Sequence, residues 1–197
     1  MKTCSNCGLP APGSTTSCAY CASEFPLTQT ATFSLQASQE RCVWMSHSGA
    51  IAEAHQEAGL WQVHGANRGE RLLTLVAIEV ERQIRVALLD SWLRSIATVV
   101  VDPVVLARKS SRARREIGYV KNRRDENVLA IFGDGPTGLH LVNRAGEVIA
   151  LASSFPGRRK GLDVIVTSPE AAPTPVTLGG LLLSVELARA GQLRPVA

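Results

Sequence analysis

The sequence predicts a mainly β protein: a closed antiparallel β-barrel around an apolar C-terminal helix, preceded by a small cysteine-rich segment. Short apolar runs of strand length recur along the second half of the chain, with turn-forming residues between them. Residues 177–190 form a helical block that is apolar on nearly all sides, so most of its surface must be buried. An apolar helix that follows a run of antiparallel strands predicts a barrel filled by its own helix.

The composition is that of a folded protein with one domain of ordinary size and a small appendage. Of the 197 residues, 45% are hydrophobic and 19% are charged, which excludes a disordered chain. No run reaches the roughly 18 apolar residues of a membrane-spanning helix, and the N-terminus lacks the apolar segment of a secretory signal. We therefore expect a cytoplasmic protein, or one attached peripherally to a membrane, whose thiols stay reduced.

Four of the five cysteines lie within the first 21 residues, as two Cys-x-x-Cys pairs separated by ten residues. Each pair turns two thiolates toward one centre, and four thiolates suit a tetrahedral zinc ion. A reducing compartment disfavours disulfides, and neither pair has the βαβ surroundings of a redox motif, although iron could use the same ligands. We expect one structural Zn²⁺ held by Cys4, Cys7, Cys18 and Cys21, with Cys42 as a buried small apolar residue.

The stretch CSNCGLPAPGSTTSCAYCASEF resembles the short zinc ribbon found at the N-terminus of many bacterial proteins. The resemblance covers residues 1–25. Proteins with this ribbon include nucleic-acid binders, protein adaptors and purely structural pieces, so the resemblance implies a metal and leaves the role open. Residues 26–30 contain Pro26 and a polar run, which predicts a linker before a body of residues 31–197.

The first half of the body can be interpreted as either strand or helix. Residues 71–101 show the 3.6-residue spacing of a helix, but they also alternate and are rich in β-branched residues. An internal repeat favours strands, because LLDSWLRSIATVV (88–100) has the same pattern as LVNRAGEVIALAS (141–153). A fainter third copy, WMSHSGAIAEA (44–54), suggests that hairpins recur through this half.

The second half reads as five strands and a helix. EIGYVKNR, NVLAIFG, GLHLVN, EVIALAS and LDVIVTS are separated by turn compositions such as DGPT and RAG. The helix follows within TLGGLLLSVELARAGQL, where Gly191 is a plausible stop signal.

This order of elements, over residues 105–190, resembles the tubby C-terminal-like superfamily, which includes the phospholipid-scramblase-like and LURP-one-related proteins. The resemblance rests on REIGYVKNRRDENVLAIFGDGPTGLHLVNRAGEVIALAS, LDVIVTS and TLGGLLLSVELA. It implies a closed antiparallel barrel threaded by an apolar C-terminal helix. The phosphoinositide-binding residues of tubby and the acidic calcium loop of the scramblases match no motif in this chain, so the resemblance assigns no site residues.

Basic charge is concentrated in two places. Residues 107–124 hold eight Lys or Arg residues against Glu116, a net charge of +7 in a chain whose total is +4, and residues 158–160 add a second cluster. Such a patch attracts the phosphates of lipid headgroups or nucleic acid, although a simple solvated loop would look the same. The candidate anion-binding residues are Arg108, Lys109, Arg112, Arg114, Arg115, Arg158, Arg159 and Lys160.

Sequence motifs of catalysis are missing. GDGPTG lacks the Gly-Lys-Ser/Thr ending of a phosphate loop, no Gly-x-Ser-x-Gly elbow occurs, and the four histidines lack metal-ligand spacing. We expect a non-catalytic, zinc-binding adaptor or binding protein that meets a protein partner or docks on anionic membrane lipid through its basic patch. The alternatives are a nucleic-acid-associated zinc-ribbon protein and, third, an unrecognised hydrolase. We expect Trp44, Trp61 and Trp92 to pack rather than to bind, and Trp92, which lies in a turn, is the one of the three to watch.

Overall fold

In the computed structural model, the described residues are 2–3, 10–11, 32–37, 41–46, 49–65, 70–79, 83–107, 114–134, 138–154 and 161–193. They form a closed barrel of twelve antiparallel strands with a helix inside it, as the sequence predicts. The barrel strands are β3 (Thr32–Ala37), β4 (Arg41–Ser46), β5 (Gly49–Glu57), β6 (Leu60–Gly65), β7 (Arg71–Glu79), β8 (Ile84–Asp90), β9 (Ser95–Val101), β10 (Arg115–Lys121), β11 (Asn127–Asp134), β12 (Gly138–Asn143), β13 (Val148–Ser154) and β14 (Gly161–Val166).

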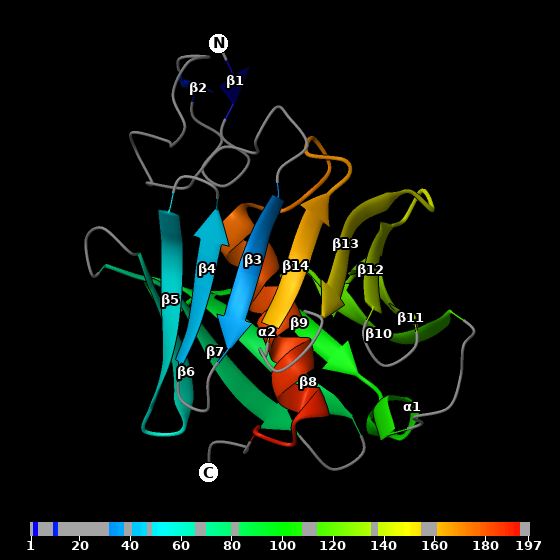
Figure 1. Cartoon of the computed structure of the whole chain (residues 1–197), viewed down its shortest axis with the longest axis horizontal. Coiled ribbons are helices and arrows are strands. Elements are labelled where there is room, and N and C mark those ends of the chain that lie inside the picture. The colour runs from blue at the N-terminus through cyan, green and yellow to red at the C-terminus, as the bar shows by residue number, and fades with distance from the viewer. Residues whose placement is uncertain are drawn as a thin grey trace.

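Each barrel strand pairs with its neighbours in the sequence, and the ring closes between β14 and β3 (Figure 1). At the closure Leu162 lies opposite Leu35, and both side chains are buried. Residues 71–101 fold as β7, β8 and β9, which confirms the strand interpretation over the helical one. Closure leaves no unpaired edge along the barrel, which removes the edge-to-edge pairing that open sheets must guard against.

Strand alternation selects the inward-facing side chains, and their sizes are complementary. On β4, Cys42 and Trp44 point into the barrel with at most 1% of their surface exposed. The neighbouring strand β5 places Ala54 opposite Cys42 and Ala52 opposite Trp44. The two alanines leave room for the indole, so this part of the wall can carry a tryptophan without overpacking.

The C-terminal helix α2 (Pro175–Arg189) runs inside the ring of strands, between β3 and β14 on one side and β7 to β9 on the other (Figure 1). It begins two residues earlier than the predicted 177–190 because Thr174 caps it, accepting the N–H of Thr177, and Pro175 fits the first turn. Leu182 and Leu183 are 1% and 3% exposed, which confirms that the helix is buried on most sides.

Two adjacent glycines of α2 have very different surroundings. The indole of Trp44 lies directly on Gly179, where a Cβ atom would be 1.3 Å from Nε1. At Gly180 the nearest atoms to a Cβ would be methyl groups of Leu73 and Leu88, at 3.2 Å. Gly179 therefore fixes how closely α2 approaches β4, whereas Gly180 sits in ordinary core packing.

The β8–β9, β10–β11 and β12–β13 hairpins share one turn. Each begins with Asp90, Asn122 or Asn143, whose side-chain oxygen accepts the backbone N–H groups two and four residues later. Each then has a residue with positive φ at the fourth position: Leu93 (61°), Asp125 (62°) and Gly146 (82°). This is the three-residue loop with a left-handed residue that antiparallel hairpins favour.

The shared turn confirms the repeat between residues 88–100 and 141–153. Sequence reasoning missed the copy at Asn122, because the left-handed position there holds Asp125 instead of the glycine found at Gly146. Asp and Asn tolerate this conformation better than other non-glycine residues, so an Asn-x-x-Asp pattern was the available signal.

The two ends of the barrel differ in the connections that they carry. The hairpin end carries the three shared turns, and the α1 end carries the short helix α1 (Pro103–Ala107) between β9 and β10 (Figure 1). Sequence reasoning missed α1, although Asp102 accepts the N–H groups of Val104 and Val105 and Pro103 takes the first helical position. An Asp-Pro pair of this kind is a recognised helix start.

Candidate functional site

The predicted zinc ligands Cys4, Cys7, Cys18 and Cys21 lie outside the described residues. In the same part of the chain, β1 (Lys2–Thr3) and β2 (Pro10–Ala11) pair antiparallel, with Lys2 opposite Ala11. This pairing brings together the two ends of the segment that contains the first Cys-x-x-Cys pair.

Cys42 is the buried apolar residue that the sequence predicts. Its side chain is 1% exposed, and burial, together with the charge of Glu186, raises the pKa of its thiol to about 12. The thiol is therefore protonated at neutral pH and unreactive. Within the described ranges, no group of three or more His, Cys, Asp or Glu residues could hold a metal ion.

The barrel topology brings the flanks of both basic runs to one end. Residues 108–113 follow α1 and precede β10, while residues 155–160 follow β13 and precede β14. Since β10 and β14 run in the same direction around an antiparallel barrel, both begin at the α1 end. Arg108, Lys109, Arg112, Arg158, Arg159 and Lys160 lie outside the described residues, and Arg114 and Arg115 lie within them.

Arg114 and Arg115 are exposed at the start of β10. The Arg114 guanidinium lies 4.6 Å from the centre of the Phe132 ring on the neighbouring strand β11. A guanidinium group that stacks on an aromatic ring retains its positive charge. These two side chains are the described part of the predicted anion-binding patch.

The structure divides the basic window of residues 107–124 between the two ends of the barrel. Lys121, Arg123 and Arg124 come after β10 has crossed the wall, so they lie at the hairpin end. Lys121 is paired there with Asp125 at 2.8 Å. Of the cations in this window that the structure describes, Arg114 and Arg115 thus lie at the α1 end, whereas Lys121, Arg123 and Arg124 lie at the hairpin end.

The tip of the β8–β9 hairpin exposes two large apolar side chains next to each other. Trp92 is 61% exposed and Leu93 is 55% exposed. The other two tryptophans, Trp44 and Trp61, are at most 3% exposed and pack in the core. The prediction that the tryptophans pack is therefore confirmed for Trp44 and Trp61 and wrong for Trp92.

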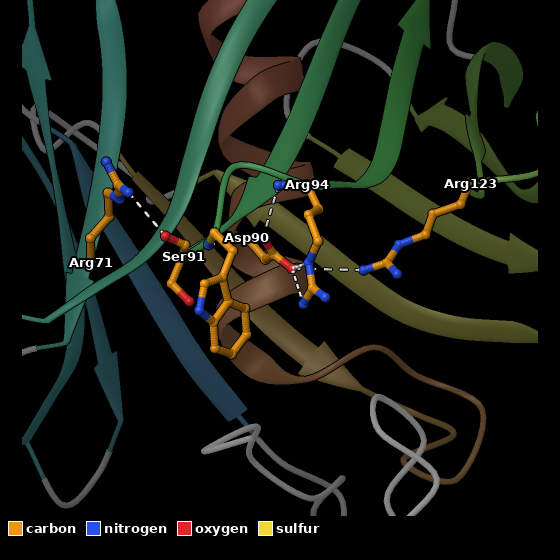
Figure 2. Close-up of polar contacts among 6 residues, drawn as sticks. Arg71, Asp90, Ser91, Arg94 and Arg123 are labelled. Carbon is orange, nitrogen blue, oxygen red and sulfur yellow. Dashed lines mark hydrogen bonds and ion pairs between the residues drawn. The ribbon is translucent and has the colours of Figure 1, made fainter. Parts of the chain in front are cut away.

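Asp90 organises this tip (Figure 2). Its carboxylate accepts the backbone N–H groups of Trp92 and Arg94 and the side chain of Arg94, at 2.8–3.0 Å. Burial raises the pKa of Asp90, but the hydrogen bonds from Arg94 and from the backbone outweigh burial and leave that pKa below its ordinary value. The carboxylate is therefore ionised at neutral pH and holds the turn in one conformation.

Three arginines surround the tip. Arg94 pairs with Asp90 at 2.7 Å and lies 4.7 Å from the ring centre of Trp92, while Arg123 is 3.8 Å from the same carboxylate. On the other side, Arg71 donates to the main-chain oxygen of Ser91 at 2.9 Å (Figure 2). The base of the tip thus holds three guanidinium groups and the one carboxylate of Asp90, so the net charge of this group is positive. Sequence reasoning missed this cluster, because Arg71 and Arg123 are distant from Asp90 in the chain.

Neither helix in the described part of the chain has the length and hydropathy needed to cross a membrane. No family model and no curated protein matches the sequence. An X-ray structure of a protein from Arabidopsis thaliana is similar over 85% of this chain and 93% of the Arabidopsis chain, with a TM-score of 0.49 and 9% identity. Similarity at this level carries no argument about function or site residues.

Proposed function

We propose that this protein is a non-catalytic, zinc-binding adaptor or binding module that docks on anionic membrane lipid through the basic residues at the α1 end of its barrel. The observation that carries the proposal is that β10 and β14 begin at one end, each directly after a basic run. The closed barrel around a buried C-terminal helix also supports the proposed likeness to the tubby-like and LURP-one-related proteins.

Electrostatics favours an anionic surface as the partner. Each Lys or Arg near such a membrane contributes about 1 kcal/mol at modest ionic strength, so several acting together give usable affinity despite screening. Single-stranded nucleic acid usually also needs exposed aromatic side chains for base stacking. At the α1 end, Phe132 is half-buried and already covered by Arg114, which favours lipid over nucleic acid.

The packed interior supports a binding role over a catalytic one. Side chains of α2 fill the inside of the barrel, among them Leu178, Leu181 and Val185, all at most 2% exposed. The interior therefore serves packing, and the ends and outer wall are the surfaces on which a partner can bind.

Removing charge from the α1 end is expected to weaken lipid binding. Arg114→Ala combined with Arg115→Ala should reduce affinity for phosphatidylserine-containing vesicles about tenfold. Each lost cation contributes about 1 kcal/mol to binding, and screening by salt lowers the combined loss. Co-sedimentation over a series of anionic-lipid fractions and salt concentrations measures the effect.

The matched control removes two exposed cations from the hairpin end, with Arg124→Ala and Arg144→Ala. This variant has the same net charge and should bind vesicles nearly as wild type does. Equal loss in both variants would show that net charge or the hairpin end, and not the α1 end alone, determines binding. Absence of vesicle binding, with tight and salt-sensitive binding to duplex DNA, would reject lipid docking in favour of the nucleic-acid alternative.

The zinc proposal has its own test. Purified protein should contain one zinc per chain, with four thiolates at about 2.3 Å, and Cys18→Ser should release it. The barrel transition should stay nearly unchanged, because α2 and the strands form their core without the ribbon. Cys42→Ala is the control and should retain a full equivalent of zinc, since Cys42 is buried within the barrel wall. Less than half an equivalent in wild-type protein prepared without chelator would refute the site.

A further inference from the structure

The tip of the β8–β9 hairpin has a feature that its two sister turns lack. At equivalent positions the β10–β11 turn carries Arg124 and Asp125, and the β12–β13 turn carries Ala145 and Gly146. Of these three turns, the β8–β9 turn is the only one with large apolar residues, Trp92 and Leu93, at both positions.

Leu93 occupies a backbone conformation that disfavours it. Its φ of 61° is in the left-handed region, where glycine, asparagine and aspartate are the tolerated residues. The side chain is 55% exposed, so burial in the core does not offset the backbone cost. A costly residue kept at an exposed tip indicates that its side chain acts on something outside the chain.

From these observations we infer that Trp92 and Leu93 insert into the interfacial region of an anionic lipid bilayer. Tryptophan prefers the headgroup level and leucine the acyl boundary just below it. The cations of Arg71, Arg94 and Arg123 lie at the base of the tip, where they face the lipid phosphates. The site is separate from the proposed α1-end patch, because it lies at the opposite end of the barrel.

The shape of the tip favours lipid over a protein partner. A stable protein interface needs about 800 Å² from each partner, with its anchors near the centre of a broad surface. Here the two exposed apolar side chains, Trp92 and Leu93, stand on one tight turn. The guanidinium group of Arg71 lies on one side of that turn, and those of Arg94 and Arg123 lie on the other (Figure 2). A soft bilayer accepts a small wedge of this kind, and its phosphates complement the surrounding positive charge.

The tryptophans provide a direct readout of insertion. Trp44 and Trp61 are buried, so the exposed and quenchable part of the emission comes from Trp92. On addition of phosphatidylcholine–phosphatidylserine vesicles, we expect a blue shift, protection from acrylamide, and quenching by lipids brominated along the acyl chain. Trp92→Phe should remove these signals while retaining vesicle binding. Vesicle-bound protein whose Trp92 stays fully open to acrylamide would overturn the inference.

Leu93→Gly separates insertion from folding. Glycine is the favoured residue at this φ and is present at Gly146 in the sister turn, so the variant should melt at the same or a higher temperature than wild type. Its affinity for the same vesicles should nevertheless fall about tenfold in the Arg114→Ala, Arg115→Ala background, where the α1 end is weakened. Unchanged affinity there would refute a role for the tip.

Two further outcomes keep this inference distinct from the proposed function. If Arg114→Ala with Arg115→Ala leaves binding unchanged but Leu93→Gly weakens it, the α1-end proposal fails and tip insertion is supported. If sedimentation velocity instead shows a wild-type dimer that Leu93→Gly dissociates, without any lipid effect, the tip contacts a second copy and lipid insertion is rejected.

Discussion

Gly179→Ala is expected to destabilise the barrel by about 3 kcal/mol or more, even though alanine is the better helix former by about 1 kcal/mol. A Cβ atom at this position would lie 1.3 Å from Nε1 of Trp44, so the indole or the whole helix must move. Trp44 is fully buried, so any shift of its indole must displace neighbouring core side chains. Urea denaturation followed by far-UV circular dichroism measures the loss.

Gly180→Ala is the matched control, one residue along the same helix. The nearest atoms to its Cβ would be side-chain methyls of Leu73 and Leu88 at 3.2 Å, which can shift by a few tenths of an ångström. Its stability should therefore stay within about 1 kcal/mol of wild type. In a Trp44→Leu background most of the cost of Gly179→Ala should disappear, as a double-mutant cycle would show. Equal effects of the two alanines would contradict the close contact between Trp44 and α2.

Leu183→Asp is expected to abolish soluble, cooperatively folding protein. The side chain is 3% exposed, and an unpaired carboxylate or a neutral acid there costs several kcal/mol, a large share of the 5–15 kcal/mol that stabilises a typical domain. Leu183→Ala should fold with a loss of about 2–5 kcal/mol, which makes the contribution of this side chain measurable. The soluble fraction on expression and the urea midpoint are the two readouts.

The control introduces an aspartate into the same helix, at its first turn. Thr177→Asp places a carboxylate at a half-buried position in the first turn, where the helix dipole favours negative charge. It should stay soluble and unfold near the wild-type midpoint. A Leu183→Asp protein that unfolds cooperatively within about 1 kcal/mol of wild type would show that α2 is not enclosed by the barrel.

Much of the fold could be predicted because its signals are local. Period-two alternation and turn residues identify the strands from β10 to β14, and the repeat between residues 88–100 and 141–153 identifies β8 and β9 as a hairpin. The buried helix follows from leucines on every side of one block. Two features were missed, the helix α1 and the likeness of the turn at Asn122 to the other two turns. Both have weaker versions of the same local signals, an Asp-Pro pair and an Asp in the left-handed position.

The candidate sites were less predictable. Charge counting marks residues 107–124 as one basic window, but β10 crosses the barrel wall within it and separates Arg115 from Arg123. Likewise, the sequence shows that Trp92 lies in a turn, but it does not show that Arg71 and Arg123 meet there. The separation of Arg115 from Arg123 and the meeting of Arg71 with Arg123 both depend on which strands become neighbours.

The sequence by itself determined that this protein is built from antiparallel hairpins and one helix that must be buried, because alternation, turn chemistry and an all-round apolar surface act over a few residues. Only the tertiary structure decided the closure of β14 on β3, the contact of Trp44 with Gly179, and the meeting of Arg71, Arg94 and Arg123 at the hairpin end. Those features depend on strand register and on contacts between distant segments. Such contacts form only when the barrel closes, and no local pattern encodes the distances between them.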